Sequence, residues 1–407
     1  MTNYKSSFYI ALLVAFIDNM GIGLVFPIFS SMLFDNSFPL VPLETSFHIR
    51  GIWLGFLLSL MPLAQFFSAP IWGAISDNKG RKKPLQLSLI IALLGYAIAF
   101  LGVLFSNIFF LLTSRAVIGF ASGNISIVQA SIADLSSQEQ KAKNFSLYAM
   151  ALGAGFALSP FIGGSLSSFG YSYPFLFAGL IVAANFLFIH FFFKETHHPT
   201  FQRKLSLIMG ISQLKKAFSF KGLRAIFLCS FLDIFAWSYF FEFIPVYLIT
   251  RFHFSPVHLG LFFGSAGGYY ALSAGLLIRP FINRFKPEIL FLLGMFLTAI
   301  VILTMPFLRS AHWLFFVMFF VCFFASFVTP TATTLVSNKA SPEVQGEALG
   351  VFTSINAIAL ILSPLFSGSI VGAYPALPMW IGGSIKLLSS LIGIVIFRKS
   401  FLTCKIN

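Results

Sequence analysis

The chain has 407 residues, of which 58% are hydrophobic and only 9% are charged, and its mean hydropathy is +0.91. A water-soluble domain carries about 25% charged residues, so this chain could not cover itself with polar surface and a soluble globular protein is excluded. Lipid is the solvent that fits this composition, with spanning helices of roughly 20 apolar residues each. The formal net charge of +14 would suggest nucleic acid in a soluble protein, so its distribution has to be examined first.

Long apolar stretches predict twelve spanning helices. In chain order they cover residues 7–33, 52–75, 84–106, 108–132, 144–169, 172–193, 222–250, 256–279, 287–307, 311–336, 344–371 and 378–397. With both termini in the cytoplasm, 21 Lys and Arg residues face that side and three, Arg50, Arg251 and Arg309, face the other. Such a bias follows the positive-inside rule. We therefore expect a multi-pass protein of the cytoplasmic (inner) membrane, with both termini cytoplasmic and no nucleic-acid partner.

Two motifs lie near the start of the chain. Helix 7–33 reads Ile17-Asp18-x3-Ile22-x3-Phe26-Pro27, which places a carboxylate inside an apolar helix. At the end of helix 52–75 the sequence reads Gly73-x3-Asp77-x2-Gly80-Arg81-Lys82-Lys83. Gly73 permits a close approach of a neighbouring helix and Gly80 permits a tight turn. Asp77 can accept hydrogen bonds from a helix N-terminus or pair with Arg81.

Two further motifs follow in the fourth and fifth helices. Helix 108–132 reads Leu111-x3-Arg115-x3-Gly119, and helix 144–169 reads Gly155-x3-Ser159-Pro160-x2-Gly163-Gly164. The glycines flatten one face of the fifth helix, and proline removes a backbone hydrogen bond and permits a bend.

Together these four motifs resemble the signatures of the major facilitator superfamily, and in particular its twelve-helix drug:proton antiporters of the tetracycline and multidrug efflux type. Ser159 stands where the antiporter signature has glycine, and Ile118 where the family has glutamine. The resemblance implies an all-α fold of two pseudo-symmetric six-helix bundles that alternate access to a central site. It also implies that the motif residues act in gating: Gly73, Asp77, Gly80, Arg81, Gly155, Ser159, Pro160, Gly163 and Gly164.

The chain also shows an internal duplication. Glu139…Ser159-Pro160…Gly164 recurs as Glu343…Ser363-Pro364…Gly368, at a constant offset of 204 residues. Repeated halves with a site between them are a known transporter design. We therefore expect bundles at 1–193 and 222–407, joined by a cytoplasmic connection at 194–221 that includes a surface helix around 213–218.

Five ionisable residues, histidines aside, fall well inside predicted helices: Asp18, Arg115, Asp233, Glu242 and Lys386. Such residues are costly in lipid and usually face a cavity or a partner. Asp18 and Asp233 lie roughly 15 Å deep at 1.5 Å per residue. Our hypothesis is that Asp18, Asp233 or Glu242 carries the proton, with Arg115 biasing Asp18. The alternative is a buried ion pair that only holds helices together, and we interpret Lys386 as such a structural partner.

Polar and aromatic residues near these charges are the candidates for substrate contact, because aromatic faces attract cationic ligands and amides can form hydrogen bonds. They are Gln65, Asn124, Gln129, Trp237, Tyr239, Phe243 and Asn356. The three cysteines are scattered and show no metal-ligand spacing, so we expect neither a metal nor a cofactor.

The function predicted from these features is proton-coupled export of small amphipathic compounds or drugs by a monomer that is not an enzyme. An importer of a nutrient, amino acid or siderophore remains a second hypothesis, because the fold alone does not imply function. A membrane receptor or scaffold that has lost transport is a third, although it predicts loss of the intramembrane acids or gain of a soluble domain.

Overall fold

The computed structural model describes residues 2–35, 38, 40–137, 140–197, 209–217, 219–220, 222–341 and 344–402. Within these ranges every regular element is a helix. Twelve helical spans among them are long and apolar enough to cross a membrane. The predicted all-α class with twelve transmembrane helices is therefore confirmed.

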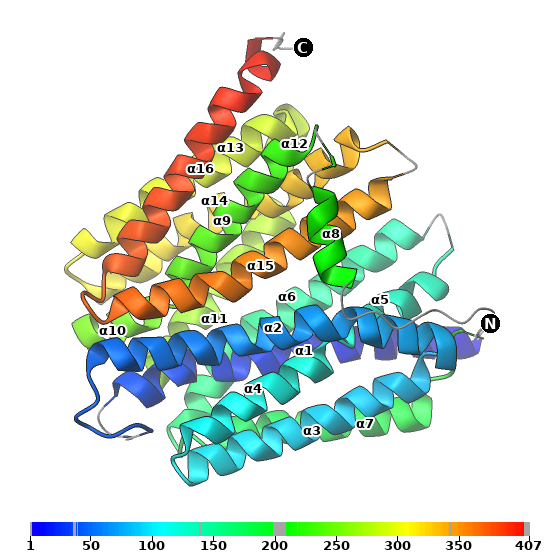
Figure 1. The fold of residues 1–407 in the computed structure, drawn as a ribbon, viewed down its shortest axis with the longest axis horizontal. Helices are drawn as coiled ribbons and strands as arrows, with labels where there is room; N and C mark the ends of the chain where they lie inside the picture. Colours follow the sequence, from blue (N-terminus) through cyan, green and yellow to red (C-terminus); the bar gives the residue numbers. More distant parts are fainter. Residues whose placement is uncertain are drawn as a thin grey trace. The chain divides into compact units, whose positions relative to one another are not determined.

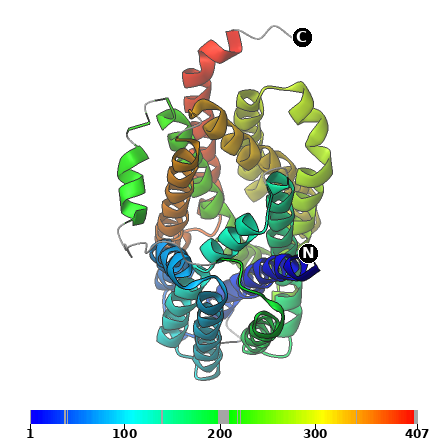
Figure 2. The same ribbon diagram turned by 90° about the vertical axis from the view of Figure 1, so that its right-hand side faces the viewer.

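The chain divides into two compact units. The first unit holds α1 (Thr2–Phe34), α2 (Phe47–Lys79) from Phe56 onward, α3 (Lys82–Leu104), α4 (Ile108–Ser122), α5 (Ile125–Asp134), α6 (Lys141–Ser167), α7 (Tyr173–Phe192) and α11 (Pro256–Leu272) as far as Gly267. Within it α1 packs on α6 and α7, and α3 packs on α4 and α7. Figure 1 shows α3 alongside α4 and α7, and Figure 2 looks nearly along these helices.

The second unit holds the first turns of α2, the end of α11, a π-helical turn (Ser273–Leu277), α9 (Arg224–Phe241), α10 (Ile244–Phe252), α12 (Arg279–Arg284), α13 (Pro287–Thr304) with a 3₁₀ turn (Met305–Phe307), α14 (Ala311–Lys339), α15 (Gln345–Val371) and α16 (Leu377–Leu402). Here α9 packs on α15 and α16. The first spans of the two halves of the sequence, α1 and α9, thus pack alike: α1 packs on the last two spans of its half, α6 and α7, and α9 packs on the last two of its own, α15 and α16. Buried apolar side chains such as Phe291, Met295 and Phe352 form a core between α9, α13, α14, α15 and α16.

Three of the spans that hydropathy predicts as continuous are interrupted. Span 108–132 breaks between α4 and α5, where Gly123 supports helix poorly and packs so tightly that a Cβ atom would lie 2.8 Å from the backbone nitrogen of Ala69. Span 222–250 breaks after α9, because Pro245 at the start of α10 has no N–H to continue the hydrogen-bond ladder. Span 256–279 passes through the π-helical turn before Pro280 opens α12.

The predicted surface helix of the connection at 194–221 is present as α8 (Met209–Ala217). Its Lys216 pairs with Glu347 at the start of α15, with 2.5 Å between Nζ and Oε1. Phe218 and residues 198–208 lie outside the described residues, as do Glu139 and Glu343, the first members of the two repeats.

Candidate functional site

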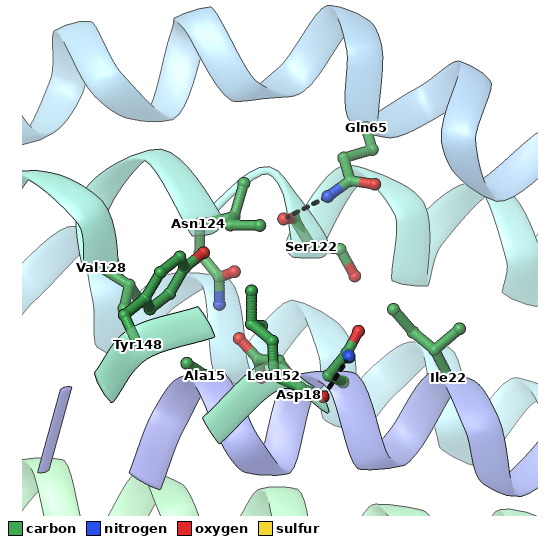
Figure 3. Close-up of a pocket in the computed structure, with 11 residues that line it drawn as sticks. Ala15, Asp18, Ile22, Gln65, Ser122, Asn124, Val128, Tyr148 and Leu152 are labelled. Carbon is green, nitrogen blue, oxygen red and sulfur yellow. Dashed lines mark hydrogen bonds between the residues drawn. The ribbon is translucent and has the colours of Figure 1, made fainter. Parts of the chain in front are cut away.

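A cavity of about 240 Å³ lies within the first unit, beside the middle of α1 (Figure 3). It is lined by Ala15, Asp18, Asn19, Ile22, Gln65, Ser122, Asn124, Ile125, Val128, Tyr148 and Leu152. The structure thus brings together three of the residues predicted from sequence, Asp18, Gln65 and Asn124. One carboxylate, several neutral polar groups and apolar walls are the features of a small-molecule site.

Close packing of α1 on α6 places Asp18 at this cavity. A Cβ atom on Gly155 would meet the carbonyl oxygen of Phe16, and one on Gly163 would meet that of Leu24. Glycines at these positions let the two backbones approach closely. Asn19 then donates from Nδ2 to the carbonyl oxygen of Leu152 at 2.6 Å, which fixes the rotation of α1 beside Asp18.

The break between α4 and α5 supplies another wall of the cavity. Gln65 of α2 donates to the Ser122 carbonyl oxygen at 3.2 Å, which gives a partner to a group at the end of α4. Asn124 donates from Nδ2 to Ser88 of α3 at 3.2 Å, and Figure 3 shows its amide directed toward Asp18. Helix α5 begins at Ile125 on the cavity wall.

Two other residues predicted in this region lie off the cavity wall. Gln129 donates to the Tyr148 hydroxyl at 3.3 Å, and so positions a residue that does line the cavity. Arg115 is only 5% exposed. Its Nε donates to the Leu57 carbonyl oxygen at 3.0 Å, and its guanidinium lies over the Phe29 ring at 5.2 Å.

In the second unit, Asp233 of α9 forms a buried ion pair with Lys386 of α16. The two residues are 3% and 1% exposed. The Lys386 ammonium also lies 5.7 Å from the centre of the Trp237 ring. Lys386 therefore has an acidic partner, and that partner is one of the three carboxylates considered as proton carriers.

The remaining candidates of the second unit lie around the break after α9. Tyr239 and Phe243 are buried, at 2% and 0% exposed, and Tyr239 packs on the Phe235 ring. Glu242 is the residue that ends α9 and is partly buried. Asn356 of α15 has a buried Oδ1 atom that finds no hydrogen-bond partner among the described residues.

The loop between α2 and α3 forms a charged cluster in the first unit. Arg81 is 4% exposed, and its Nη1 donates to Asp77 Oδ1 at 2.6 Å and to Ser76 Oγ at 2.9 Å. Its Nε donates to Asp134 Oδ2 at the end of α5, at 2.9 Å. Burial lowers the pKa of Arg81, but the bonds to Asp134 and Asp77 outweigh burial and hold the pKa above its ordinary value. The guanidinium therefore joins α2, α3 and α5 as a permanent cation.

The glycines of the loop motif differ in what they do. Gly80 has φ +82°, the left-handed region that favours glycine. A Cβ atom on Gly73 would lie 3.7 Å from Ser126 Oγ, which is an ordinary contact, so the packing seen here has room for a side chain at that position.

The motif of the fifth predicted span lies in α6, and its other residues also face neighbouring backbones in the first unit. They are Ser159, Pro160 and Gly164. Ser159 is fully buried against Gly23 of α1. A Cβ atom on Gly164 would lie 2.9 Å from the Cα atom of Gly260 on α11. The motif therefore contacts α1 on one side and α11 on the other.

Sequence reasoning missed several residues that the structure places in these sites. Asn19 and Tyr148 line the cavity, Asp134 completes the Arg81 cluster, and Glu195 lies beside that cluster. Asn19 is adjacent to Asp18, and Glu195 is the only acid among the basic residues of 194–221. Both signals are present in the sequence, whereas nothing local marks Tyr148 or Asp134.

Comparison with known proteins gives consistent results. The profile of the Major Facilitator Superfamily matches residues 8–364 and 226–400. The chain is 28% identical to the class G tetracycline resistance protein of Vibrio anguillarum, over 98% of this chain and 99% of that protein. It is 26% identical to the quinolone resistance protein NorA of Staphylococcus aureus, over 93% and 94%. The solved structure of a D-xylose–proton symporter superposes with a TM-score of 0.75 at 15% identity, covering 96% of this chain and 97% of that one.

Proposed function

The chain belongs to the Major Facilitator Superfamily, and on this basis we propose that it is a secondary active transporter that exports small amphipathic compounds, drugs among them, in exchange for protons. The observation that carries the proposal is the Asp18 carboxylate on the wall of a cavity that also presents Gln65, Asn124 and apolar side chains. The similarity to tetracycline and quinolone resistance proteins supports export.

In this proposal Asp18 couples the proton to the substrate. A carboxylate inside the membrane can exchange its proton when the cavity opens to water on either side, and it can bind a cationic or hydrogen-bonding compound when it is ionised. Proton and substrate then compete for one group, which is the requirement for exchange in opposite directions. Each charge moved along the membrane potential contributes about 2.3 kcal/mol per 100 mV. Gln65 and Asn124 would hold the polar groups of the compound, and Ile22 and Val128 would contact its apolar part.

We place proton coupling at Asp18 and not at Asp233. Protonation of Asp233 would leave the Lys386 ammonium buried and uncompensated, which is costly. Glu242 stays the second candidate, because it ends α9 at the break before α10. Arg115, whose Nε donates to the Leu57 carbonyl oxygen, would bias the protonation of Asp18 through its positive charge.

Alternating access would be the motion of bundles 1–193 and 222–407, joined by 194–221, with both termini in the cytoplasm. The close backbone contacts of Gly155, Gly163 and Gly164 support a gating role for α6, because small residues let helices slide past each other without side chains between them. The Asp77–Arg81 pair would hold the cytoplasmic ends of α2, α3 and α5 together during that motion.

The test has two parts. A panel of tetracyclines, quinolones, dyes, sugars and amino acids is first screened by thermal stabilisation of the purified protein, because a ligand of the folded state raises its melting temperature. Any compound that stabilises is then followed in everted vesicles energised by an imposed proton gradient. We expect drugs to stabilise and to accumulate inside everted vesicles as protons leave. Stabilisation by a sugar or amino acid alone, with transport in the other direction, would establish the importer instead.

A further inference from the structure

Glu195 follows the end of α7 and belongs to none of the four motifs, yet its carboxylate accepts four backbone hydrogen bonds. Oε1 accepts from the backbone nitrogens of Arg81 at 2.6 Å, Thr196 at 3.0 Å and His197 at 3.1 Å. Oε2 accepts from the backbone nitrogen of Lys82 at 3.1 Å. Two of these donors, Arg81 and Lys82, lie at the start of α3, more than a hundred residues earlier in the chain.

These bonds cap α3 from outside. The first N–H groups of a helix have no partner within the helix, and Arg81, which precedes α3, makes no side-chain cap. Glu195 supplies the missing acceptor and an anion at the positive end of the helix dipole. Burial raises the pKa of Glu195, but the four backbone bonds outweigh it and hold the pKa below its ordinary value. The side chain is therefore a carboxylate at neutral pH.

Gly80 leaves room for this carboxylate because it has no side chain. A Cβ atom at Gly80 would lie 2.6 Å from Glu195 Oε2 and 2.7 Å from its Cδ. The same glycine needs its positive φ of +82°. Two independent constraints, the backbone conformation and the approach of Glu195, therefore exclude a side chain at this motif position.

The chain next to Glu195 is also anchored to other helices of the first unit. The Lys194 backbone nitrogen donates to Ser7 Oγ of α1 at 2.9 Å, and Ser7 Oγ contacts the Lys194 carbonyl oxygen at 3.3 Å. Lys82 Nζ donates to the carbonyl oxygen of His190 on α7 at 2.9 Å. The beginning of the connecting segment is thus fixed to α1, α3 and α7 at one point.

We infer that Glu195 is the positioning residue of the Arg81 cluster: it fixes the turn 80–82 so that the Arg81 guanidinium bridges Asp77 and Asp134. It also ties the start of the connecting segment to that cluster. Movement of the cluster and movement of the connection are then mechanically linked. The positioning of the turn stands on the contacts alone, whereas its effect on transport rests on the proposed function.

The experiment compares the full-length chain with Glu195→Gln, which keeps the shape but loses the charge, and with Glu195→Ala. Glu288→Gln is the matched control, because Glu288 is likewise an acid at the N-terminal end of a helix, α13. Hydrogen exchange is measured in peptides that cover the Arg81 and Lys82 amides, and transport is measured as maximal rate and KM. In Glu195→Ala we expect exchange at these amides to become roughly tenfold faster, the factor that corresponds to about 1.4 kcal/mol. Glu195→Gln should be intermediate and Glu288→Gln unchanged.

The transport readout separates positioning from a structural role. We expect the maximal rate to fall in both Glu195 variants while KM stays within about twofold, because the cavity itself is unaltered. Exchange equal to wild type would overturn the inference that Glu195 fixes the turn. Faster exchange with an unaltered maximal rate would overturn its link to gating. If the wild-type chain transports nothing, the proposed function fails while amide exchange still decides the role of Glu195.

Discussion

Gly260 of α11 lies directly against Pro160 of α6: a Cβ atom on Gly260 would be 2.5 Å from the Pro160 carbonyl oxygen. The internal repeat makes the same contact elsewhere, since a Cβ atom on Gly55 would be 2.5 Å from the carbonyl oxygen of Pro364. The first contact lies within the first unit and the second within the second unit. In each unit the motif proline thus contacts a glycine from the other half of the sequence. Pro160 contacts Gly260, and Pro364 contacts Gly55.

This contact predicts that a single methyl group at Gly260 is harmful. Gly260→Ala should destabilise the protein by about 1–3 kcal/mol, as overpacking does, and should slow transport, because α11 can no longer approach α6. Thermal unfolding in detergent and the initial transport rate measure the two effects. Gly268→Ala on the same helix is the control, since in the part of the chain that the structure describes no heavy atom lies within 4 Å of a Cβ atom there. Equal behaviour of the two variants would contradict the close contact.

The packing of α6 on α1 gives a second prediction. A Cβ atom on Gly163 would be 2.9 Å from the carbonyl carbon of Leu24, whereas one on Gly153, in the same helix, would meet no atom of the described residues within 4 Å. Gly163→Ala should lower stability by about 1–3 kcal/mol and shift α1, and so weaken substrate binding at Asp18. Gly153→Ala should be neutral. Substrate affinity and melting temperature are measured for both, and an affinity unaffected by Gly163→Ala would separate this packing from the cavity.

The buried ion pair gives a third prediction. Removing one charge with Lys386→Met or Asp233→Asn should cost about 3–5 kcal/mol, because the other charge is left unpaired. The double variant Asp233→Asn/Lys386→Met should cost much less than the two single effects together. Thermal unfolding of the four proteins measures this coupling.

The exposed pair of Lys216 and Glu347, with side chains 54% and 38% exposed, is the matched control. Lys216→Met should change stability by less than about 1 kcal/mol. Additive effects at Asp233 and Lys386 would show that the pair is not the source of their stability.

Glu195 predicts how stability depends on pH. Its pKa in the folded protein lies below the ordinary value of 4.5, so its contribution is complete above that value and is lost as pH falls through the folded pKa. The groups of Arg81, Lys82 and His197 that donate to the carboxylate are backbone N–H groups, which do not titrate in this range. The stability difference between wild type and Glu195→Gln should be the same at pH 7 and pH 6 and shrink below about pH 4.5. A difference that instead grew on acidification would reverse the assigned direction.

The sequence alone predicts the spans well, because one quantity, the length of an apolar stretch, decides whether a helix can cross the bilayer. It does not predict the breaks. Gly and Pro are frequent in membrane helices, so Gly123 and Pro245 do not by themselves mark a break. Only the structure shows that the helical hydrogen bonds of the backbone are interrupted there. The same limit applies to the site. Asp18 stands out as a charge in an apolar helix, whereas Tyr148 joins it only through the packing of α6 on α1.

Pairings across the chain were the least predictable feature. Asp233 and Lys386 each stand out in sequence, yet their partnership joins α9 to α16 and requires the fold. Asp134 is an acid at the end of an apolar helix, which in sequence indicates no particular role. Only its 2.9 Å bond to Arg81 shows that it belongs to the cluster. Long-range contacts of this kind leave no local pattern.

The measurement that tests the account most directly compares wild type with Asp18→Asn in proteoliposomes, recording proton flux and substrate flux together. We expect Asp18→Asn to insert and fold, to exchange substrate across the membrane without a gradient, and to lose substrate-dependent proton flux and gradient-driven accumulation. Proton-driven transport at the wild-type rate in Asp18→Asn would contradict the assignment of coupling to the cavity in the first unit.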